Sequence, residues 1–264
     1  MRNYSPARVP YEPTTRDSPQ LLRELVGAAD SVELKFCLAD HQIRQASTAL
    51  GLDLRNARPR RIFYLDTPDL ALSRVGLIVR VRRIHRVKDD AVIKLRPATP
   101  WQLGADLRCQ KGFKVDVDVM PDGFVCSASL KCRPAAGAIA QAVAGRLPWS
   151  GLFTAGQRRF FSTHAPEGLT LDDLGVLGPV LALKERHNPP GLPYPLTVEL
   201  WTYPTGNRLL EISTRVPPAA AFAAMADWRE FLERHRLLPG GSELTKTLAT
   251  LQLLTSSPAR SEPR

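Results

Sequence analysis

The sequence has few cysteines and no long apolar run, and each scarcity excludes a class of protein. The four cysteines, Cys37, Cys109, Cys126 and Cys132, include no CxxC pair. A thiolate zinc site is therefore not expected, and a reduced, cytoplasmic setting is the default. No apolar run reaches the roughly 20 residues that cross a bilayer, and nothing resembles the apolar core of a secretory leader. We therefore expect no membrane partner.

Histidines and acidic residues are also scarce. None of the five histidines (His41, His85, His164, His187, His235) has metal-ligand spacing, so each is interpreted as a surface residue. The 26 Asp and Glu are outnumbered by 36 Lys and Arg, which gives a formal net charge of +10. This excess favours an anionic partner, whether nucleic acid, membrane surface or phosphorylated small molecule, and charge alone does not choose among them.

The 264 residues, 44% of them hydrophobic, are enough to bury a core. Residues 1–30 contain four prolines among charges and predict a flexible leader with a short helix at residues 21–28. Residues 255–264 predict a disordered tail. The sequence thus predicts one folded domain over residues 31–254, without internal repeats.

Period-two alternation of apolar and polar residues dominates this domain and predicts a strand-rich fold, closed or nearly closed, with peripheral helices. Helical patterns are fewer, at residues 40–50, 135–147, 218–235 and 243–254. Turn residues at 121–123 and 204–207 predict hairpins, so neighbouring strands are expected to be antiparallel. The alternating runs lie at residues 32–38, 61–66, 77–85, 91–96, 113–119, 157–163, 180–186, 196–203 and 208–216.

Several of these runs place charged residues two apart, which puts them on one face of a strand. On an ordinary sheet such a face is solvated, but repetition across five strands favours a barrel with a polar lumen. Converging cations there would repel one another unless a polyanion or carboxylates neutralised them. The pairs and triplets are Glu33 and Lys35; Arg80 and Arg82; Lys94 and Arg96; Lys114, Asp116 and Asp118; and Lys184 and Arg186.

A mixed arginine and lysine lining suits a chain of phosphoryl groups, because arginine offers a bidentate fork and lysine a point charge. Carboxylates in such a lining are explained if they hold Mg²⁺ or Mn²⁺, which take oxygen ligands from carboxylates and substrate phosphates. Glu33, Glu199 and Glu211, each on a strand pattern, are the candidate metal ligands.

Taken in order, these motifs resemble the CYTH superfamily, the triphosphate tunnel metalloenzymes. The segment VELKF (32–36) is similar to the ExExK first strand, YLDTPDLAL (64–72) to the YFDTPDxxL segment and GLIVRVRR (76–83) to the LRxR strand. AVIKLR (91–96) resembles the TLK strand, Arg158 and Arg159 the mid-chain arginine strand, LLEIS (209–213) the EIEL strand and TKT (245–247) the closing SK segment. The resemblance covers about residues 31–252, and its Asp-Thr-Pro and Arg-x-Arg combination is quite specific.

The resemblance implies an α+β fold: a closed antiparallel barrel of eight strands, the triphosphate tunnel, with peripheral helices. It implies that Glu33 and Glu211 hold metal and, with Lys35, form the catalytic centre. Family members cleave inorganic triphosphate, thiamine triphosphate or the 5′ triphosphate of RNA, and one branch converts ATP to cyclic AMP. The residues it assigns to phosphate binding are Lys35, Arg80, Arg82, Lys94, Arg158 or Arg159, Lys184 and Lys246.

Two departures bear on catalysis. Ser31 and Ser213 stand where the family has acidic residues, and a hydroxyl is a poorer Mg²⁺ ligand than a carboxylate. Metal affinity is therefore expected to be weaker, or occupancy limited to one ion, although Glu199, Asp172, Asp173, Asp116 or Asp118 could compensate. The segment at residues 97–149 has no counterpart in minimal family members and is expected to narrow or cap the tunnel.

Three classes of function follow. The leading hypothesis is a metal-dependent phosphohydrolase acting on a triphosphate, with adenylate cyclase as the enzymatic alternative, since phosphoryl transfer needs mainly positioning and charge neutralisation. A non-catalytic polyphosphate or nucleotide binder is the second class, favoured by Ser31 and Ser213. Nucleic-acid binding ranks last, because no recognition helix or aromatic RNA-binding signature is visible. The sequence does not choose the triphosphate or the oligomeric state.

Overall fold

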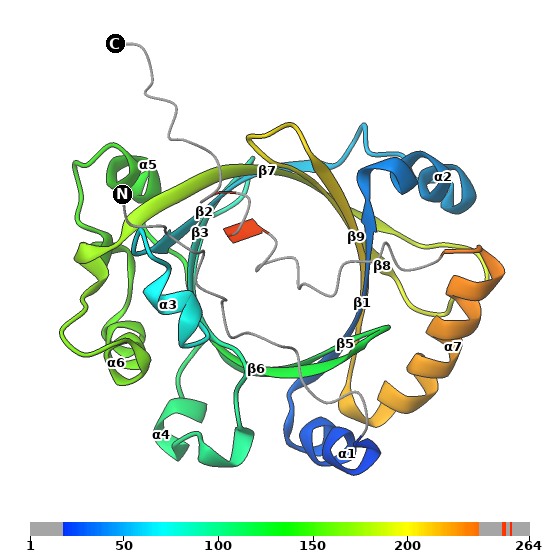
Figure 1. The fold of residues 1–264 in the computed structure, drawn as a ribbon, viewed down its shortest axis with the longest axis horizontal. Helices are drawn as coiled ribbons and strands as arrows, with labels where there is room; N and C mark the ends of the chain where they lie inside the picture. Colours follow the sequence, from blue (N-terminus) through cyan, green and yellow to red (C-terminus); the bar gives the residue numbers. More distant parts are fainter. Residues whose placement is uncertain (1–17, 238–249, 252–253, 255–264) are drawn as a thin grey trace, which may run out of the picture.

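A computed structural model describes residues 18–237, 250–251 and 254. Nine strands close into a barrel in the order β1-β5-β6-β4-β3-β2-β7-β8-β9, and the helices lie around its outside (Figure 1). The closed barrel and the peripheral helices confirm the predicted architecture, but the expectation of eight strands is wrong. The strands are β1 (Ser31–Ala39), β2 (Arg58–Asp66), β3 (Leu77–Ile84), β4 (Asp90–Leu95), β5 (Phe113–Met120), β6 (Gly123–Cys132), β7 (Gly175–His187), β8 (Leu196–Thr202) and β9 (Arg208–Val216).

Eight of the nine alternating sequence runs lie in strands, and the structure adds one strand that alternation missed. The extra strand, β6, follows the predicted turn at residues 121–123, and Met120 of β5 faces Gly123 across it. Its sequence GFVCSASLKC has a short central run of small residues, which gives little contrast between the two faces. The β5–β6 hairpin lies between β1 and β4, within the segment that the family resemblance left without a counterpart.

The pairing of β1 with β5 is parallel, whereas all-antiparallel neighbours were expected. Between β4 and β5 the chain passes through the 3-10 helix η1 (Pro100–Gln102) and α4 (Ala105–Arg108) outside the barrel. This connection returns the chain to the end at which β4 began, so β5 runs in the same direction as β1. The other eight neighbouring pairs are antiparallel.

Residues 157–163, expected as a strand, belong to the helix α6 (Ala155–His164) outside the barrel. Thr154 caps this helix in a capping box with Gln157, a signal that the alternation argument overlooked. Phe160 and Phe161 lie three and four positions after Gln157, which is helical spacing, and all three are buried. The strand prediction was therefore wrong because two adjacent phenylalanines mimic a short apolar run.

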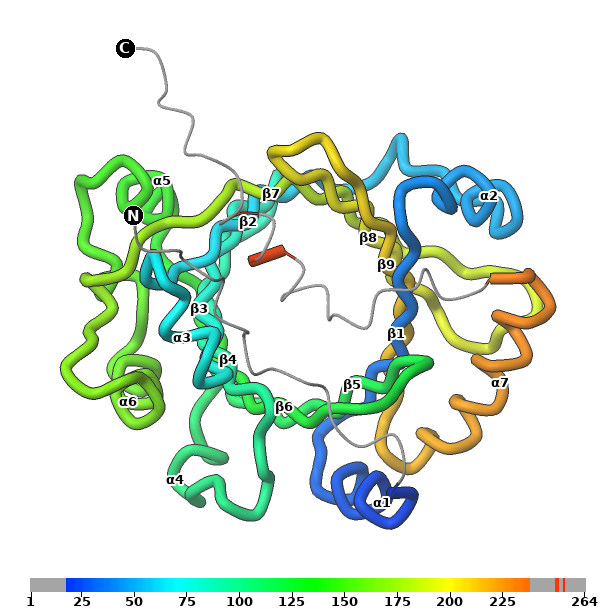
Figure 2. The backbone as a smooth tube through the Cα atoms, in the orientation of Figure 1, coloured from blue at the N-terminus to red at the C-terminus, as the bar shows by residue number. Residues whose placement is uncertain are grey.

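The remaining helices cover the outer surface, as the tube in Figure 2 shows. The predicted helix at residues 40–50 is confirmed as α2, and that at residues 21–28 is present within α1, whose Leu25 and Val26 are buried. Residues 1–17, most of 243–254 and all of the tail at 255–264 lie outside the described residues. The helices are α1 (Pro19–Ala28), α2 (Asp40–Leu50), α3 (Ala71–Arg74), α5 (Ala138–Val143) and α7 (Ala221–Arg234), with short 3-10 turns η2 (Trp149–Leu152), η3 (Leu171–Asp173) and η4 (Pro218–Ala220).

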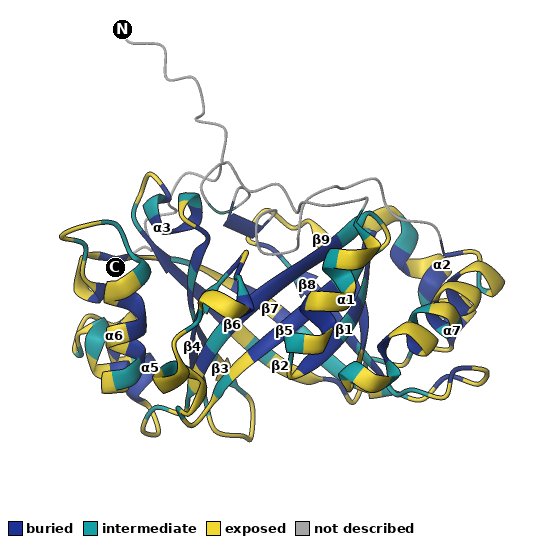
Figure 3. Cartoon of the chain, turned by 90° about the horizontal axis from the view of Figure 1, so that it is seen from below, coloured by how far each residue is buried: buried dark blue, intermediate teal, exposed yellow. Residues whose placement is uncertain are grey.

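The core lies mainly between the barrel wall and these helices. In β3, Leu77, Val79 and Val81 point outward and are buried, while Arg80 and Arg82 alternate with them and line the interior. Figure 3 shows buried residues along the strands and exposed residues on the outer faces of the helices. Each buried aliphatic side chain contributes roughly 1.5–3 kcal/mol. The apolar outer face thus supplies the hydrophobic stabilisation of the barrel.

Inside the barrel, a smaller apolar cluster occupies one side. Ile62, Tyr64 and Trp201 pack there with Leu251, which is only 3% exposed. The segment that contains Leu251 is seen within the ring of strands in Figure 1. The rest of the interior is left to the charged residues described next. In the described part of the chain, no helix is long and apolar enough to span a membrane.

Candidate functional site

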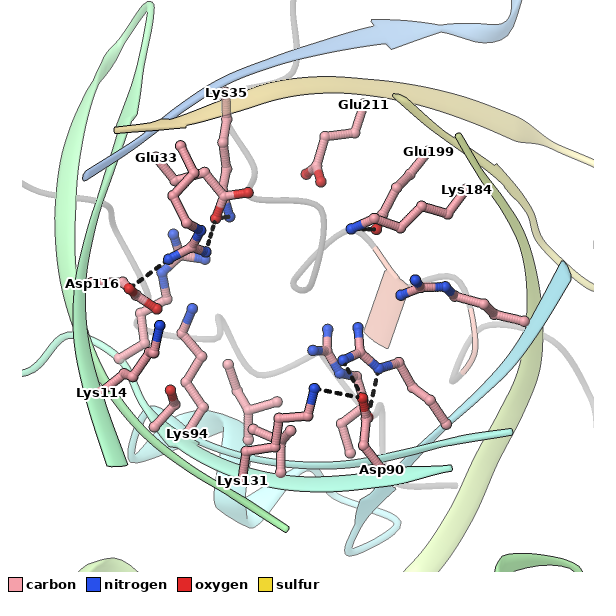
Figure 4. A pocket seen from close by; sticks show the side chains of 18 of the residues that line it. Glu33, Lys35, Asp90, Lys94, Lys114, Asp116, Lys131, Lys184, Glu199 and Glu211 are labelled. Atoms are coloured by element: carbon pink, nitrogen blue, oxygen red, sulfur yellow. Dashed lines mark hydrogen bonds and ion pairs between the residues drawn. The ribbon is translucent and has the colours of Figure 1, made fainter. Parts of the chain in front are cut away.

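The barrel encloses a cavity of about 1140 Å³, into which charged side chains project from every part of the wall (Figure 4). Twelve lysines and arginines line it against six carboxylates, so the lining carries an excess of positive charge. The basic residues are Lys35, Arg60, Arg80, Arg82, Lys94, Arg96, Lys111, Lys114, Lys131, Arg133, Lys184 and Arg215, and the acidic ones are Glu33, Asp90, Asp116, Asp122, Glu199 and Glu211.

Asp118 of β5 is the centre of one buried charge cluster. Its side chain is 1% exposed, forms ion pairs with Lys35 at 3.1 Å and with Lys94 at 3.6 Å, and accepts a hydrogen bond from Arg96. Burial alone would raise the pKa of Asp118, but Lys35, Lys94 and Arg96 hold it well below its usual range. One carboxylate therefore holds three cations together.

The two lysines of this cluster differ in their titration. Burial lowers the pKa of Lys94 to about 8 despite Asp118, because Arg96 and Lys35 add repulsion. Burial would also lower the pKa of Lys35, but Asp118, Glu33 and Glu211 raise it above its usual value. Lys94 is thus a lining lysine that loses its charge as pH rises through about 8.

Arg215 of β9 organises the neighbouring carboxylates. Its guanidinium donates to Glu33 at 2.7 Å, to Asp116 at 2.6 Å and to the Ser31 hydroxyl at 2.5 Å. Ser31 in turn donates to Asp116 at 2.6 Å. Burial would raise the pKa of Glu33, but Lys35 and Arg215 keep it below its usual range. A fixed cation therefore already neutralises these acidic groups.

A third cluster holds an arginine rigid at one end of the cavity. Arg82 of β3 donates to both oxygens of Asp90 at 2.7 Å, the bidentate geometry of a strong ion pair. Lys131 contacts the same carboxylate at 2.9 Å. Burial would raise the pKa of Asp90, yet the hydrogen bonds from Arg82 lower it to about 2. The remaining guanidinium edge of Arg82 is held in a fixed orientation.

Glu199 and Glu211 are direct cross-strand partners on β8 and β9, and both line the cavity. Glu199 accepts from Lys184 at 3.0 Å and from the indole of Trp201 at 3.1 Å. Directly opposite residues in an antiparallel pair have Cβ atoms roughly 4.5–5.5 Å apart. Two carboxylates therefore meet on this wall, on the side of the lumen opposite Asp90 in Figure 4.

The β2–β3 wall contains buried donors without protein acceptors. The Nε atoms of Arg60 and Arg80 and the hydroxyl of Tyr64 are buried and have no hydrogen-bond partner in the described structure. Tyr64 and Arg80 are cross-strand partners, and neither arginine forms an ion pair with the described residues. Burial and repulsion from Arg82 lower the pKa of Arg60. Unsatisfied buried donors cost about 1–3 kcal/mol each, so this wall is arranged to receive acceptor oxygens.

The structure brings eight of the predicted site residues into this one cavity: Glu33, Lys35, Arg80, Arg82, Lys94, Lys184, Glu199 and Glu211. Arg158 and Arg159 are exposed on α6 outside the barrel, so they are not part of this lining. Arg158 donates instead to the carbonyls of Phe153 and Ser150. Lys246 lies outside the described residues.

Several lining residues were missed by the sequence analysis. Arg60 lies one position before the predicted alternating run at residues 61–66, and it alternates with Ile62 and Tyr64, so it shares their inward face. Arg215 falls at the end of β9, two positions after Ser213, and its role depends on β1 and β5. Its even spacing from Glu211 could have placed it on the inward face of this strand, but its partners follow only from the barrel closure, which places the three strands side by side.

The predicted metal ligands fit a divalent ion only in part. Glu33 is neutralised by Arg215 and Lys35, and within the described ranges no group of three or more His, Cys, Asp or Glu is placed to hold a metal. Of the three predicted ligands, Glu33 lies on β1 beside these two cations, whereas Glu199 and Glu211 lie side by side on β8 and β9. Glu199 and Glu211 alone match the one or two carboxylates with which proteins hold Mg²⁺ when substrate phosphates complete its shell.

Comparison with known proteins identifies the fold. No protein-family model and no curated protein sequence matches this chain. Its structure is similar to a candidate adenylate cyclase of Bacillus halodurans, with a TM-score of 0.58, 11% identity and coverage of 84% of this chain and 97% of that one. A candidate adenylyl cyclase of Hippeastrum with a dominant triphosphatase activity also gives a TM-score of 0.58, at 15% identity, covering 83% of this chain and 94% of that one. These likenesses confirm the fold implied by the sequence motifs.

Proposed function

We propose that the protein binds a linear triphosphate in the barrel and hydrolyses it with the help of a divalent cation, which Glu199 and Glu211 would hold. The observation that carries this proposal is the pair of cavity-lining arginines on the β2–β3 wall, Arg60 and Arg80, whose buried Nε atoms have no acceptor among the described residues, in a cavity with excess positive charge. A chain of phosphoryl groups supplies both the acceptors and the negative charge that this wall lacks.

The other lining cations provide further phosphate-binding groups around the lumen. Arg82 is oriented by Asp90, so its free donors are pre-organised for phosphate oxygens. Lys94 of β4 and Lys184 of β7 project into the lumen from the strands on either side of β2 and β3, and each adds a point charge. Burial lowers the pKa of Lys184, and Glu199 opposes that effect. A bound anion would raise this pKa further, because negative charge nearby favours the protonated lysine.

Hydrolysis needs little covalent chemistry from the protein, because phosphoryl transfer depends mainly on positioning and charge neutralisation. A divalent cation, when bound, neutralises phosphate charge and polarises the reacting phosphoryl group. Glu199 and Glu211 are the residues that would hold it. Arg60 and Arg80 would bind the phosphate oxygens, and no side-chain nucleophile is required.

Two alternatives make different predictions. A cyclase would use the same cradle for ATP, and both similar structures carry a cyclase assignment. A non-catalytic binder is favoured by Arg215, whose guanidinium pairs with Glu33 and Asp116 beside Ser31. These carboxylates are then neutralised by the protein itself rather than by a metal ion. The fold likeness to a protein with triphosphatase activity and the Glu199–Glu211 pair support hydrolysis over both.

Phosphate release tests the proposal. Purified protein is incubated with tripolyphosphate or ATP in Mg²⁺, Mn²⁺ or chelator, and orthophosphate and cyclic AMP are measured together. Metal-dependent orthophosphate release from tripolyphosphate is expected. Cyclic AMP from ATP without orthophosphate would favour the cyclase, and tight binding of tripolyphosphate without turnover would favour the binder.

The metal ligands can be separated by substitution. We expect Glu199→Gln and Glu211→Gln each to lower metal-dependent turnover at least tenfold and to weaken Mn²⁺ binding to the triphosphate complex, measured by electron paramagnetic resonance. Glu33→Gln is the matched control, since Arg215 and Lys35 already neutralise Glu33, and it should leave Mn²⁺ affinity within about twofold. Loss of Mn²⁺ binding in Glu33→Gln alone would assign the metal to Glu33 instead of Glu199 and Glu211.

Lys94 gives the tunnel a pH-dependent affinity. Because its folded-state pKa is about 8, its charge is present below that pH and is lost above it. Tripolyphosphate affinity should therefore fall as pH rises through this range, by about tenfold for one charged contact. Calorimetric titrations of wild type and Lys94→Arg, whose guanidinium stays charged, check this. An equally steep fall in Lys94→Arg would mean that another group titrates.

A further inference from the structure

Three neighbouring strands bring oxygen atoms together around one arginine in the lumen. In the closed barrel β1 lies between β5 and β9. Ser31 of β1 faces Asp116 across the pairing with β5. Glu33 of β1 faces Arg215 across the pairing with β9. In Figure 4, Glu33 and Asp116 lie on one side of the lumen and Glu199 on the other. This group of four residues, here called the Arg215 site, is therefore separate from the carboxylate pair of β8 and β9.

The guanidinium of Arg215 lies where a cation is needed among these oxygen atoms. One terminal nitrogen donates to Asp116 Oδ1 at 2.6 Å and to Ser31 Oγ at 2.5 Å, and the other donates to Glu33 Oε2 at 2.7 Å. Two carboxylates are as many as proteins commonly use to hold Mg²⁺ when phosphates complete its shell. Without a cation between them, the two carboxylates would repel each other. The chain thus fills with its own side chain a place that would otherwise suit a divalent ion.

The positive charge of this site is permanent. Burial would lower the pKa of Arg215, but Glu33 and Asp116 raise it above its usual value, so the guanidinium stays charged. Lys35 adds a second cation, at 3.3 Å from Glu33 and at 3.1 Å from Asp118. A divalent ion that entered here would meet two fixed positive charges and carboxylates that are already ion-paired. The Arg215 site is therefore closed to a metal ion as long as the arginine is present.

Arg215 can contact a phosphate without releasing its carboxylates. The terminal nitrogen that contacts Glu33 carries a second N–H, and Nε carries another. Neither donates to a residue in the described part of the chain. The side chain lines the cavity and is 44% exposed, so a ligand in the lumen can reach it. A guanidinium held in this way offers phosphate oxygens both charge and directed hydrogen bonds.

We propose that Arg215 takes the place of a divalent ion on this side of the lumen: it binds a phosphoryl group directly, and one exchangeable ion, at Glu199 and Glu211, is sufficient. This inference rests on the proposed function, which supplies the ligand and the exchangeable ion. It gives Ser31 a role, because its hydroxyl joins Asp116 to the guanidinium. An arginine neutralises phosphate charge but does not polarise water as a metal ion does, so hydrolysis keeps its metal requirement.

The test counts metal ions in variants of Arg215. Electron paramagnetic resonance measures the Mn²⁺ bound to the complex of protein and tripolyphosphate. Arg215→Gln removes the cation, and Arg215→Lys keeps a positive charge. Arg208→Gln is the matched control on the same strand, because Arg208 is exposed and pairs with Asp40 of α2. Calorimetry measures tripolyphosphate affinity in chelator and in Mn²⁺, and urea denaturation with and without Mn²⁺ measures stability in the absence of tripolyphosphate.

Wild type, Arg208→Gln and Arg215→Lys should each bind one Mn²⁺ per complex. Arg215→Gln should bind a second ion, because Glu33 and Asp116 are then left without the guanidinium. Its tripolyphosphate affinity in chelator should fall by about tenfold or more, and Mn²⁺ should raise this affinity by a larger factor than in wild type. Without tripolyphosphate, Mn²⁺ should protect Arg215→Gln against urea more than it protects wild type.

Two Mn²⁺ ions in the wild-type complex would overturn the inference and leave the proposed function standing. An Arg215→Gln variant that binds one ion, and holds tripolyphosphate in chelator as tightly as wild type, would also overturn it. If Arg215→Gln did not fold, the ion count of wild type would decide. Absence of tripolyphosphate binding to wild type would overturn the proposed function, and the effect of Mn²⁺ on the urea denaturation of Arg215→Gln would then decide the inference alone.

Discussion

Asp118→Asn is expected to lower the free energy of unfolding by about 3–5 kcal/mol, the usual cost of breaking a buried ion pair from one side. The substitution leaves Lys35, Lys94 and Arg96 close together without their shared carboxylate. Urea denaturation at pH 7 measures the change. Asp106→Asn on the exposed helix α4 is the control and should cost less than about 0.5 kcal/mol.

Ligand and pH should each modify this effect. Tripolyphosphate supplies negative charge to the same lumen, so it should stabilise Asp118→Asn more than wild type. The lowered pKa values of Asp118 and Asp90 mean that these carboxylates stabilise the fold above about pH 4, and that this stability is lost as pH falls toward 2 and below. Asp118→Asn should therefore lose less stability on acidification than wild type. A variant as stable as wild type would show that the three cations do not need Asp118.

Arg60→Gln combined with Arg80→Gln is expected to weaken tripolyphosphate binding by about 100-fold or more, because each charged hydrogen bond contributes about 1.5–3 kcal/mol. These arginines have no ion-pair partner among the described residues, and their Nε atoms are unsatisfied. Their removal should therefore leave the stability of the unliganded protein unchanged or slightly higher. Calorimetry of binding and urea denaturation together measure this separation of affinity from stability.

Arg159→Gln is the matched control for this pair, since it removes an exposed arginine from α6 outside the barrel. It should leave tripolyphosphate affinity within about twofold of wild type. If the double variant bound tripolyphosphate as tightly as wild type and Arg159→Gln abolished binding, the ligand would lie on the outer surface rather than in the tunnel.

The inner face of the barrel was predictable where alternation is regular. In β3 the central residues VRVR (79–82) alternate regularly, and both Arg80 and Arg82 line the cavity as expected. Prediction failed where the pattern was short or had weak contrast. The paired phenylalanines of α6 imitated a strand, and the serines and alanine of β6 concealed one.

Other features depend on tertiary contacts and could not be predicted locally. The pairing of Arg215 with Glu33 and Asp116 exists because β9, β1 and β5 lie side by side in the closed barrel. That contact explains why Glu33, a predicted metal ligand, is already neutralised. The buried donors of Arg60 and Arg80 likewise become visible only when their strand partners are known.

The most direct measurement of the central claim is a crystallographic difference map of the protein with tripolyphosphate. We expect density for a phosphate chain inside the barrel, within hydrogen-bond distance of Arg60, Arg80 and the Tyr64 hydroxyl. In crystals that contain Mn²⁺, an anomalous peak is expected beside Glu199 and Glu211. Density for the ligand only outside the barrel, with the lumen unchanged, would contradict the assignment of this cavity as a triphosphate site.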